Sequence, residues 1–450
     1  MTPTYYRVDV SATAPSGRSV GSRRRGVVLV VVMWLLLVLG MLVLGLTRSA
    51  SVDASLSRGE IERVQAAWLA RAGVEQALAV LGDDTSEFDG RGDVWYDDPG
   101  RFENVALAEG HTFRVTAPPE EGNADATLPR FGLDDLASRV PVNAAQRNQL
   151  RNLPEITLAQ VDALLDWIDT NESARAGGAE RGYYNELDFP YTIRNGPMRT
   201  HREMLLVRGI DPESFFGEDG NLNGTLERNE NDGDLTWPDD TADRQLEPGL
   251  AQYTTVHSYD LNTTLGGLPR VNPKTTAADT LATSLGLTPS LAEEVVEQAN
   301  DADSLFDLVG LQGDGSDRDP TLTDEITLEW LAGAWETLTL EDDERLPGKI
   351  NVNTASRAVL ETVPGMRPEM ADAIIGQRAS QGDFSGVGGL HSRNTLNDRQ
   401  FQRVATSLTV RSNVFRVMSE GRTPSGTTAR LEVIIDRGGE QPAIIDWRRP

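Results

Sequence analysis

The residues with the clearest chemical pattern in the chain lie between Asp219 and Glu230. Side chains that carry oxygen stand at the first, third, fifth and twelfth positions of this segment, and Gly224 stands at the sixth. The spacing matches the calcium-loop pattern D-x-[DN]-x-[DN]-G-x5-E at each constrained position. Because calcium takes about six to eight oxygen ligands, the segment predicts a Ca²⁺ site. The expected ligands, including the carbonyl oxygen of Thr225, are Asp219, Asn221, Asn223, Thr225, Glu227 and Glu230.

Further carboxylates follow this loop and extend the acidic segment over residues 218–243. They could complete the same site or form a second one, and they are Asp232, Asp234, Asp239 and Asp240. The alternative is a solvated acidic loop, which is the usual role of a charge run. Because no long amphipathic helices flank the segment, we expect an isolated calcium-type loop rather than a complete helix–loop–helix hand.

The remaining chemistry-bearing residues form no catalytic pattern. The histidines are scattered, and none has the spacing of a metal site: His111, His201, His257 and His391. The sequence contains neither a nucleophile elbow nor a phosphate-binding loop. Asp166 and Asp169, on either side of Trp167, are interpreted as helix-end and turn residues rather than as an acid–base pair. The sequence therefore predicts a protein that is not an enzyme.

The composition limits the classes of partner. The 450 residues carry a formal net charge of -27 and include no cysteine. Nucleic-acid binding requires clustered lysine and arginine, so we expect no nucleic acid as a partner. Because disulfides are impossible, an exported body of this size must gain its rigidity from a large core or from bound metal.

One apolar run is long enough to span a membrane. Residues 26–46 include no charged side chain, and Arg23, Arg24 and Arg25 precede them directly. A helix of this length spans the hydrocarbon core of a bilayer. The basic flank predicts a cytoplasmic N-terminus, with the body on the other side of the membrane. Residues rich in Ala, Leu, Glu and Arg continue the expected helix to Leu81.

The start of this run carries a processing pattern. A basic leader, Gly26, a long apolar helix start and an amphipathic half follow one another. This order resembles the class III signal of type IV pilins and pseudopilins. The resemblance implies that a prepilin peptidase cuts between Gly26 and Val27 and methylates the new amine. The simpler alternative is an ordinary single-span anchor.

Two segments with the same offset of 210 residues repeat one pattern. Asn143 recurs as Asn353, and Pro154 recurs as Pro364. Each copy predicts a strand-like entry, a helix, a proline turn and a second helix, which together make a helix-hairpin-helix unit. A weaker third copy, aligned on Val271-Asn272, requires a two-residue insertion.

The residues at the turns of these units help to decide whether the units bind nucleic acid. DNA-binding versions present glycine amides to phosphate at the turn. Here one copy keeps Gly365, whereas Glu155 takes that place in the other, and adjacent basic residues are sparse. We therefore expect the units to pack against protein rather than against DNA.

The order of motifs around the first copy is specific. It runs through Leu165-Asp166-Trp167-Ile168-Asp169, Gly182-Tyr183-Tyr184, Asn195-Gly196-Pro197-Met198 and Glu203-Met204-Leu205-Leu206-Val207-Arg208-Gly209-Ile210. Lys349-Ile350-Asn351-Val352-Asn353-Thr354-Ala355 follows in the second copy. The order resembles the general secretion pathway protein K family, the large minor pseudopilins of type II secretion. The resemblance runs from Arg23 to about Asp436.

The resemblance implies an α+β fold in which a long N-terminal pilin helix packs on an antiparallel sheet. A large, mostly α-helical insertion with helix-hairpin-helix (SAM-like) repeats splits this pilin core. The strand patterns support the split independently. Predicted strands at residues 105–107, 112–115 and 131–136 precede the helical part, and strands at 414–418 and 429–436 follow it. Two side-by-side domains are the alternative, but neither strand group alone makes a sheet that covers the long helix.

The expected domains follow from this arrangement. They are the basic prepilin leader at 1–26, the transmembrane half of the helix at 27–46, the first part of the pilin-like core at 47–138, the helical insertion at 139–345 with its acidic loop at 218–243, the second helix-hairpin-helix copy at 346–408 and the C-terminal strands at 409–450.

The resemblance implies a minor pseudopilin at the tip of the type II secretion pseudopilus, which initiates or caps assembly for protein export across the outer membrane. Major pilins carry a glutamate at the fifth mature position, where it pairs with the amine of a neighbour inside the membrane. Here that position is Val31, and the first acid after the leader is Asp53. A subunit without this carboxylate suits the end of a filament.

The implied partners are I-type and J-type minor pseudopilins, the prepilin peptidase, the inner-membrane secretion platform and the lipid bilayer. Two alternatives share parts of the pattern. One is a minor pilin of a type IV pilus, and the other is a membrane-anchored helix-hairpin-helix protein of DNA uptake.

Overall fold

The computed structural model describes residues 23–120, 128–317 and 319–448. The predicted leader therefore lies outside the described residues up to residue 22. The chain divides into two units, Met1–Glu62 and Arg63–Pro450, which are treated separately below.

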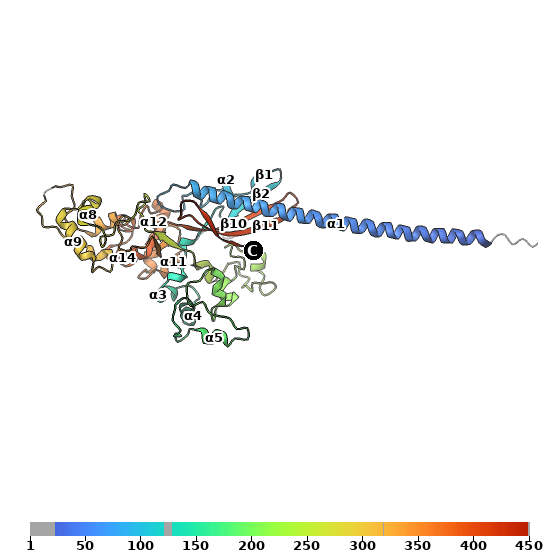
Figure 1. The fold of residues 1–450 in the computed structure, drawn as a ribbon, viewed down its shortest axis with the longest axis horizontal. Coiled ribbons are helices and arrows are strands. Elements are labelled where there is room, and N and C mark those ends of the chain that lie inside the picture. The colour runs from blue at the N-terminus through green and yellow to red at the C-terminus, as the bar shows by residue number, and fades with distance from the viewer. Residues whose placement is uncertain (1–22, 121–127, 318, 449–450) are drawn as a thin grey trace, which may run out of the picture. The chain divides into compact units, whose positions relative to one another are not determined.

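The described part of the first unit is helical. It is the N-terminal portion of α1 (Arg23–Asp83) (Figure 1). Nearly all side chains from residue 27 to residue 46 are exposed, and they are apolar. Among the described residues α1 is the one helix that is long and apolar enough to cross a bilayer. This is consistent with a single-pass anchor, because such a surface is stable in lipid and not in water.

The second unit contains an antiparallel sheet of six strands among the described residues. The order is β1-β2-β10-β11-β12, and β3 pairs with β10. The strands are β1 (Val105–Ala108), β2 (His111–Thr116), β3 (Asp134–Asp135), β10 (Val414–Arg422), β11 (Thr428–Asp436) and β12 (Ala443–Arg448). Val115 of β2 lies opposite Ser419 of β10, so strands from before and after the insertion share one sheet. The predicted split pilin core is thereby confirmed.

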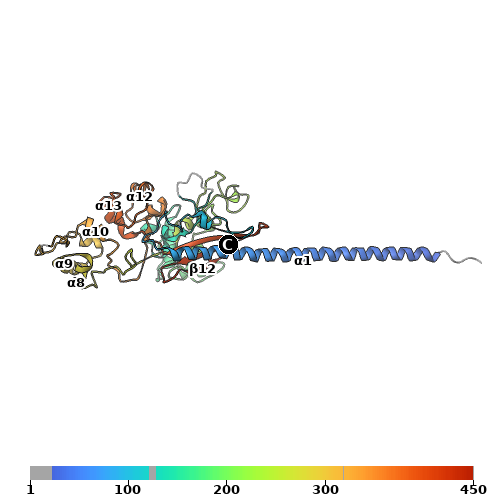
Figure 2. The same cartoon turned by 90° about the horizontal axis from the view of Figure 1, so that it is seen from above.

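The C-terminal part of α1 packs on this sheet, as Figures 1 and 2 show for β10, β11 and β12. Ser419 Oγ donates a hydrogen bond to the carbonyl of Ala70 at 2.8 Å. A Cβ on Gly421 would lie 2.1 Å from the carbonyl oxygen of Ala66. The missing side chain therefore lets helix and strand approach closely. Val74, Phe113 and other apolar side chains fill the interface.

The strand predicted at residues 131–136 is shorter than expected. Only Asp134 and Asp135 form β3, and the 3₁₀ helix η1 (Leu136–Ser138) begins directly after them. The cause is local, because a carboxylate oxygen of Asp135 accepts a hydrogen bond from the N–H of Ala137 at 2.7 Å and caps the turn. The chain thus leaves the sheet two residues after it enters.

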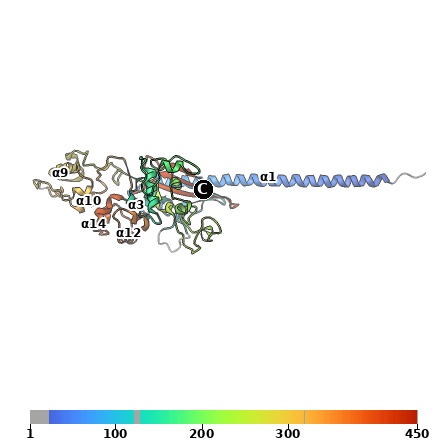
Figure 3. The same ribbon diagram turned by 90° about the horizontal axis from the view of Figure 1, so that it is seen from below.

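Short helices dominate the insertion between β3 and β10 (Figure 3). They are α3 (Arg147–Leu150), α4 (Leu158–Ile168), α5 (Arg181–Asn185), α6 (Pro212–Phe216), α7 (Leu250–Tyr253), α8 (Ala278–Leu285), α9 (Pro289–Ala299), α10 (Leu328–Ala334), α11 (Arg357–Thr362), α12 (Pro368–Gln381), α13 (Gly389–Ser392) and α14 (Asp398–Val404). The 3₁₀ helices are η2 (Val142–Ala144), η3 (His201–Leu206), η4 (Arg228–Glu230), η5 (Leu305–Leu308) and η6 (Ala405–Ser407). One further helix, α2 (Pro99–Phe102), belongs to the pilin core.

Short strand pairs accompany these helices. They are β4 (Val140–Pro141) with β5 (Thr254–Thr255), β6 (Tyr259–Leu261) with β7 (Arg345–Pro347) and β8 (Ile350–Asn351) with β9 (Leu408–Thr409). The first and third pairs are parallel, and each lies at the entry of a helix-hairpin-helix copy. A single parallel bridge between Val271 and Leu338 has the corresponding place in the third copy.

The three copies share one register. The residues that cap the two helices of each copy lie eleven positions apart: Gln146 and Thr157, Ala277 and Thr288, Ser356 and Arg367. The turn between the helices has a residue with positive φ at the same place, which is Glu155, Gly286 or Gly365. The weak third copy is therefore a full repeat unit. The two-residue insertion was wrong, because Asn272 corresponds to Asn351 and not to Asn353.

A buried polar network ties the last repeat to the pilin core. The amide of Asn351 donates to the carbonyl of Asp89 at 3.3 Å, to the carboxylate of Asp135 at 3.3 Å and to Ser412 Oγ at 2.9 Å. The carboxylate of Asp89 in turn forms an ion pair with Arg437 at 2.5 Å. These groups fix the insertion against the sheet, because each buried polar group needs its partner.

Candidate metal centres

The segment predicted to bind calcium forms one closed loop that follows α6 and ends with η4. Asp219 is fully buried, and its two carboxylate oxygens accept hydrogen bonds from the N–H groups of Asn223 at 3.0 Å and Gly224 at 2.8 Å. Gly224 has a φ of +71°, as the turn at this position requires. The first ligand position thus faces the inside of the loop.

The last predicted ligand returns to the same place. Glu230 is 1 % exposed and accepts hydrogen bonds from the N–H groups of Gly220 at 3.2 Å and Glu227 at 3.0 Å. Burial raises the pKa of the Glu230 carboxyl to about 7, and the nearby charges of Asp219 and Glu227 add to this effect. A carboxylate in such surroundings gains from a cation.

The amide groups of the two asparagines also point inward. The side-chain nitrogens of Asn221 and Asn223 each donate to the Glu227 carboxylate at 3.1 Å. The structure therefore brings together the side chains of Asp219, Asn221, Asn223, Glu227 and Glu230, and Thr225 lies between them in the same loop. The oxygen-rich composition fits a hard cation such as Ca²⁺.

The additional carboxylates form a separate neighbouring turn. Asp240 accepts hydrogen bonds from the N–H groups of Asp232 and Gly233, both at 2.9 Å. Asp234 and Asp239 are exposed. These residues organise the turn after the loop, and their described hydrogen bonds do not reach Asp219 or Glu230.

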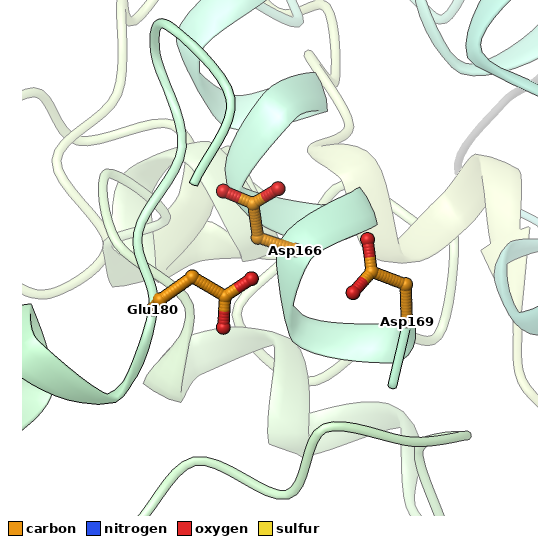
Figure 4. Close-up of side chains that lie close together, drawn as sticks. All are labelled: Asp166, Asp169 and Glu180. Carbon is orange, nitrogen blue, oxygen red and sulfur yellow. The ribbon is translucent and has the colours of Figure 1, made fainter. Parts of the chain in front are cut away.

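A second carboxylate cluster lies on the first repeat unit. Asp166 lies in α4, Asp169 follows the end of α4, and Glu180 precedes α5. Their carboxylate groups converge, as Figure 4 shows, and one oxygen of each lies within 4.8 Å of the others. Asp166 is fully buried and Glu180 is 7 % exposed. Neither oxygen of Glu180 accepts a hydrogen bond of ordinary geometry from the described residues.

The charges in this cluster are unbalanced. Arg175 pairs with Asp166 at 2.5 Å and with Asp169 at 2.7 Å, so its guanidinium pairs with two of the three carboxyl groups and not with Glu180. Burial, together with the nearby charges of Asp166 and Asp169, raises the pKa of Glu180 to about 7. A Cβ on Gly178 would lie 1.8 Å from an oxygen of Asp166, so glycine keeps the cluster open at that point. Three carboxylates without His or Cys suit a hard cation.

Sequence reasoning missed this cluster. Asp169 does follow a helix end, as interpreted, but Asp166 points into the protein beside it. The loop at residues 170–179 brings Glu180 back to both of them. The sequence signal for this cluster was the position of acidic residues beside Trp167, a residue type expected in the core. A charged side chain next to a core residue needs a partner.

The cluster lies within a recognisable domain. Residues 129–216 match the family described as "Type II secretion system (T2SS), protein K". This part of the chain is a protein K domain of type II secretion. The match supports the role of a minor pseudopilin in the type II secretion system. Residues 347–409 match the helix-hairpin-helix motif, at the place of the second predicted copy.

One solved structure with similarity to this chain is described as the crystal structure of the GspK-GspI-GspJ complex from the enterotoxigenic Escherichia coli type 2 secretion system. A chain of that structure is 14 % identical, with a TM-score of 0.46, and the match covers 88 % of this chain and 99 % of that one. No curated protein matches this chain in sequence.

Proposed function

We propose that this chain occupies the tip of the pseudopilus, where it initiates or caps assembly for protein export across the outer membrane. The observation that carries this proposal is Val31 at the fifth position after Gly26. Its side chain is 51 % exposed on an apolar helix surface, so it offers no carboxylate to a neighbouring amine inside the lipid. The subunit accordingly has no charge partner for another subunit stacked above it.

The insertion supports the same position. It occupies the chain from η1 to β9, far more residues than the sheet that it interrupts. A subunit of this bulk obstructs the regular stacking of small pilin cores. Its role is structural, and it catalyses no reaction.

The proposed membrane arrangement follows from the N-terminal residues. The prepilin peptidase cuts between Gly26 and Val27, the new amine is methylated, and the body lies in the periplasm beyond one span of the inner membrane. Gly26→Ala should leave the leader in place, so the variant should migrate more slowly than wild type on a denaturing gel. Equal migration of both proteins in their processed form would contradict this step.

The proposed partners are the I-type and J-type minor pseudopilins, the names of which appear in the description of the similar E. coli structure. The secretion platform of the inner membrane receives the assembled tip. Val31→Glu in the full chain should reduce co-purification with these two partners and reduce secretion. Val32→Ala, at the next position of the helix, is the matched control. If Val31→Glu secretes and co-purifies as wild type does, the tip assignment fails.

The loop at Asp219–Glu230 and the cluster of Asp166, Asp169 and Glu180 are proposed as Ca²⁺ centres. In each centre, buried carboxyl groups lie close to one another, and the described residues supply too few positively charged side chains to balance them. A bound Ca²⁺ would neutralise this repulsion and stiffen a chain that has no disulfides.

A further inference from the structure

The antiparallel sheet has two faces, and α1 packs on one of them. The hydrogen bond from Ser419 Oγ to the carbonyl of Ala70 places the side chain of Ser419 on the α1 face. Because side chains alternate along a strand, those of Met418 and Glu420 in β10 point to the opposite face. Residues that lie directly across the ladders share this second face, and they are Arg114, Thr116, Arg430 and Glu432.

The loop at Asp219–Glu230 lies over this second face. Loop and sheet enclose a cavity of about 250 Å³. Met418 and Thr116 line the cavity from the sheet, and Thr225 and Leu226 line it from the loop. The insertion therefore meets the pilin core at the same segment that is proposed to hold Ca²⁺.

Direct packing joins the loop to the core beside this cavity. A Cβ on Gly224 would lie 2.6 Å from the Cβ of Pro118, which follows the end of β2 by two residues. Gly224 also donates its N–H to a carboxylate oxygen of Asp219 at 2.8 Å. The residue that contacts the core thus also orients the first proposed ligand.

A second position of the loop is held in the same region. Leu222, the fourth residue of the loop, is 6 % exposed and lines a smaller cavity together with Ile434 of β11. Ile434 follows Glu432 by two residues in the strand, so it lies on the same second face of the sheet. The loop therefore has the sheet on its outer side along several residues, while its ligands point inward.

We propose that packing against the sheet positions the calcium loop, so that Ca²⁺ binding and the docking of the insertion on the pilin core strengthen each other. This inference rests on the proposed calcium centre at Asp219–Glu230. Coupling between two equilibria is reciprocal, so whatever docking adds to calcium affinity, calcium adds to docking. Calcium then sets how firmly the bulky insertion is attached to the sheet.

Methionine oxidation of the detergent-solubilised full chain tests the sheet side of this coupling. Met418 and Met366 are both half-buried, but Met366 lies in the turn of the last repeat unit and does not line the cavity. Calcium should slow the oxidation of Met418 by dilute peroxide about fivefold relative to a chelator, which is the lower end of ordinary coupling between two sites. Met366 should oxidise at the same rate in both conditions. Peptide mass spectrometry measures the two rates.

Calorimetry tests the loop side. Glu180→Gln serves as the background, because it leaves the loop as the remaining candidate centre. In this background Pro118→Ala with Met418→Ala should weaken calcium binding about fivefold, although neither side chain carries an oxygen that could bind the ion. Pro364→Ala with Met366→Ala removes the same two residue types from the turn of the last repeat unit and should leave the affinity unchanged.

Two results would overturn the coupling and leave the calcium centre intact. One is equal oxidation of Met418 with calcium and with chelator, in a protein that calorimetry shows to bind calcium. The other is equal calcium affinity of the two double variants. Absence of calcium binding by the loop in the Glu180→Gln background would instead refute the centre itself, and the coupling with it.

Discussion

Asn143 and Asn353 hold the main chain in the same way at equivalent positions of two repeat units. The amide of Asn143 donates to the carbonyl of Met198 at 2.9 Å, and its oxygen accepts from the N–H of Met198 at 2.8 Å. Asn353 makes the same two bonds with Phe384, at 2.9 and 2.8 Å. Each asparagine thus fixes a segment beyond the second helix of its unit. The two repeat units therefore share this pair of asparagine hydrogen bonds as well as their helix-hairpin-helix fold.

The two sites differ in burial, and this difference predicts different stability effects. Asn353 is fully buried and also donates to the carbonyl of Asp89 at 3.0 Å. Asn353→Ala should lower the free energy of unfolding by about 2–3 kcal/mol, because three buried groups lose their partner. Asn143→Ala, at a half-buried site, should cost about 1 kcal/mol. Urea unfolding followed by tryptophan fluorescence measures both, and equal costs would contradict the argument.

The turn of the first repeat carries avoidable strain. Glu155 is exposed and has a φ of +55°, where the equivalent residues are Gly286 and Gly365. Glu155→Gly should raise the free energy of unfolding by up to about 1 kcal/mol, since glycine adopts this conformation without a steric penalty. Gly365→Ala should have the opposite effect, because its Cβ would also lie 3.1 Å from that of Arg403. Thermal unfolding of both variants should show shifts of opposite sign.

Calcium should stabilise the protein through both candidate centres. At about a hundredfold excess over its dissociation constant, one bound ion adds about 2.7 kcal/mol. Asp219→Ala with Glu230→Ala should remove the gain in melting temperature that comes from the loop. Glu180→Gln should remove only the gain that comes from the other cluster. Calorimetry of the wild type that shows no binding near about millimolar calcium would exclude both sites.

The buried Asp89 predicts a pH dependence of stability. Burial raises the pKa of its carboxyl from 3.8 to about 7, although Arg437 opposes the shift. Between these two values the unfolded chain releases the proton while the folded protein keeps it, so this group makes stability fall as pH rises through that window. Asp89→Asn should flatten the profile of unfolding free energy between pH 4 and pH 7, approximately the window set by the two pKa values. Asp188→Asn, at an exposed site, is the control, and an unchanged slope in the Asp89 variant would contradict the assignment.

Local patterns predicted much of the fold. Alternating strands on both sides of the helical part indicated the split sheet, because alternation is a local signal. The repeat indicated two helix-hairpin-helix units, because its matched residues keep one constant offset. The alignment of the third unit was wrong because it matched Val271-Asn272 to the Val-Asn pairs of the other two units. The spacing between the capped helices gives the alignment that the structure shows. Cap spacing is the stronger constraint, because it fixes where each helix begins.

The sites were harder to predict. The calcium loop is contiguous, so its ligands could be read from one segment. Glu180 lies close to Asp166 only because the intervening loop folds back, and no regular spacing in the sequence indicates this.

The pairing of β2 with β10 also constrains the order in which this protein can mature. The central strand of the sheet lies at residues 414–422, near the end of the chain. A nascent chain emerging from its N-terminus presents α1 and β1–β2 long before their partner strand exists, and contacts this distant in sequence form late. The sheet therefore closes only after β10 has been synthesised. A chain that ends before β10 leaves the face of α1 around Ala70 and Val74 uncovered, so it exposes apolar surface that the finished sheet buries.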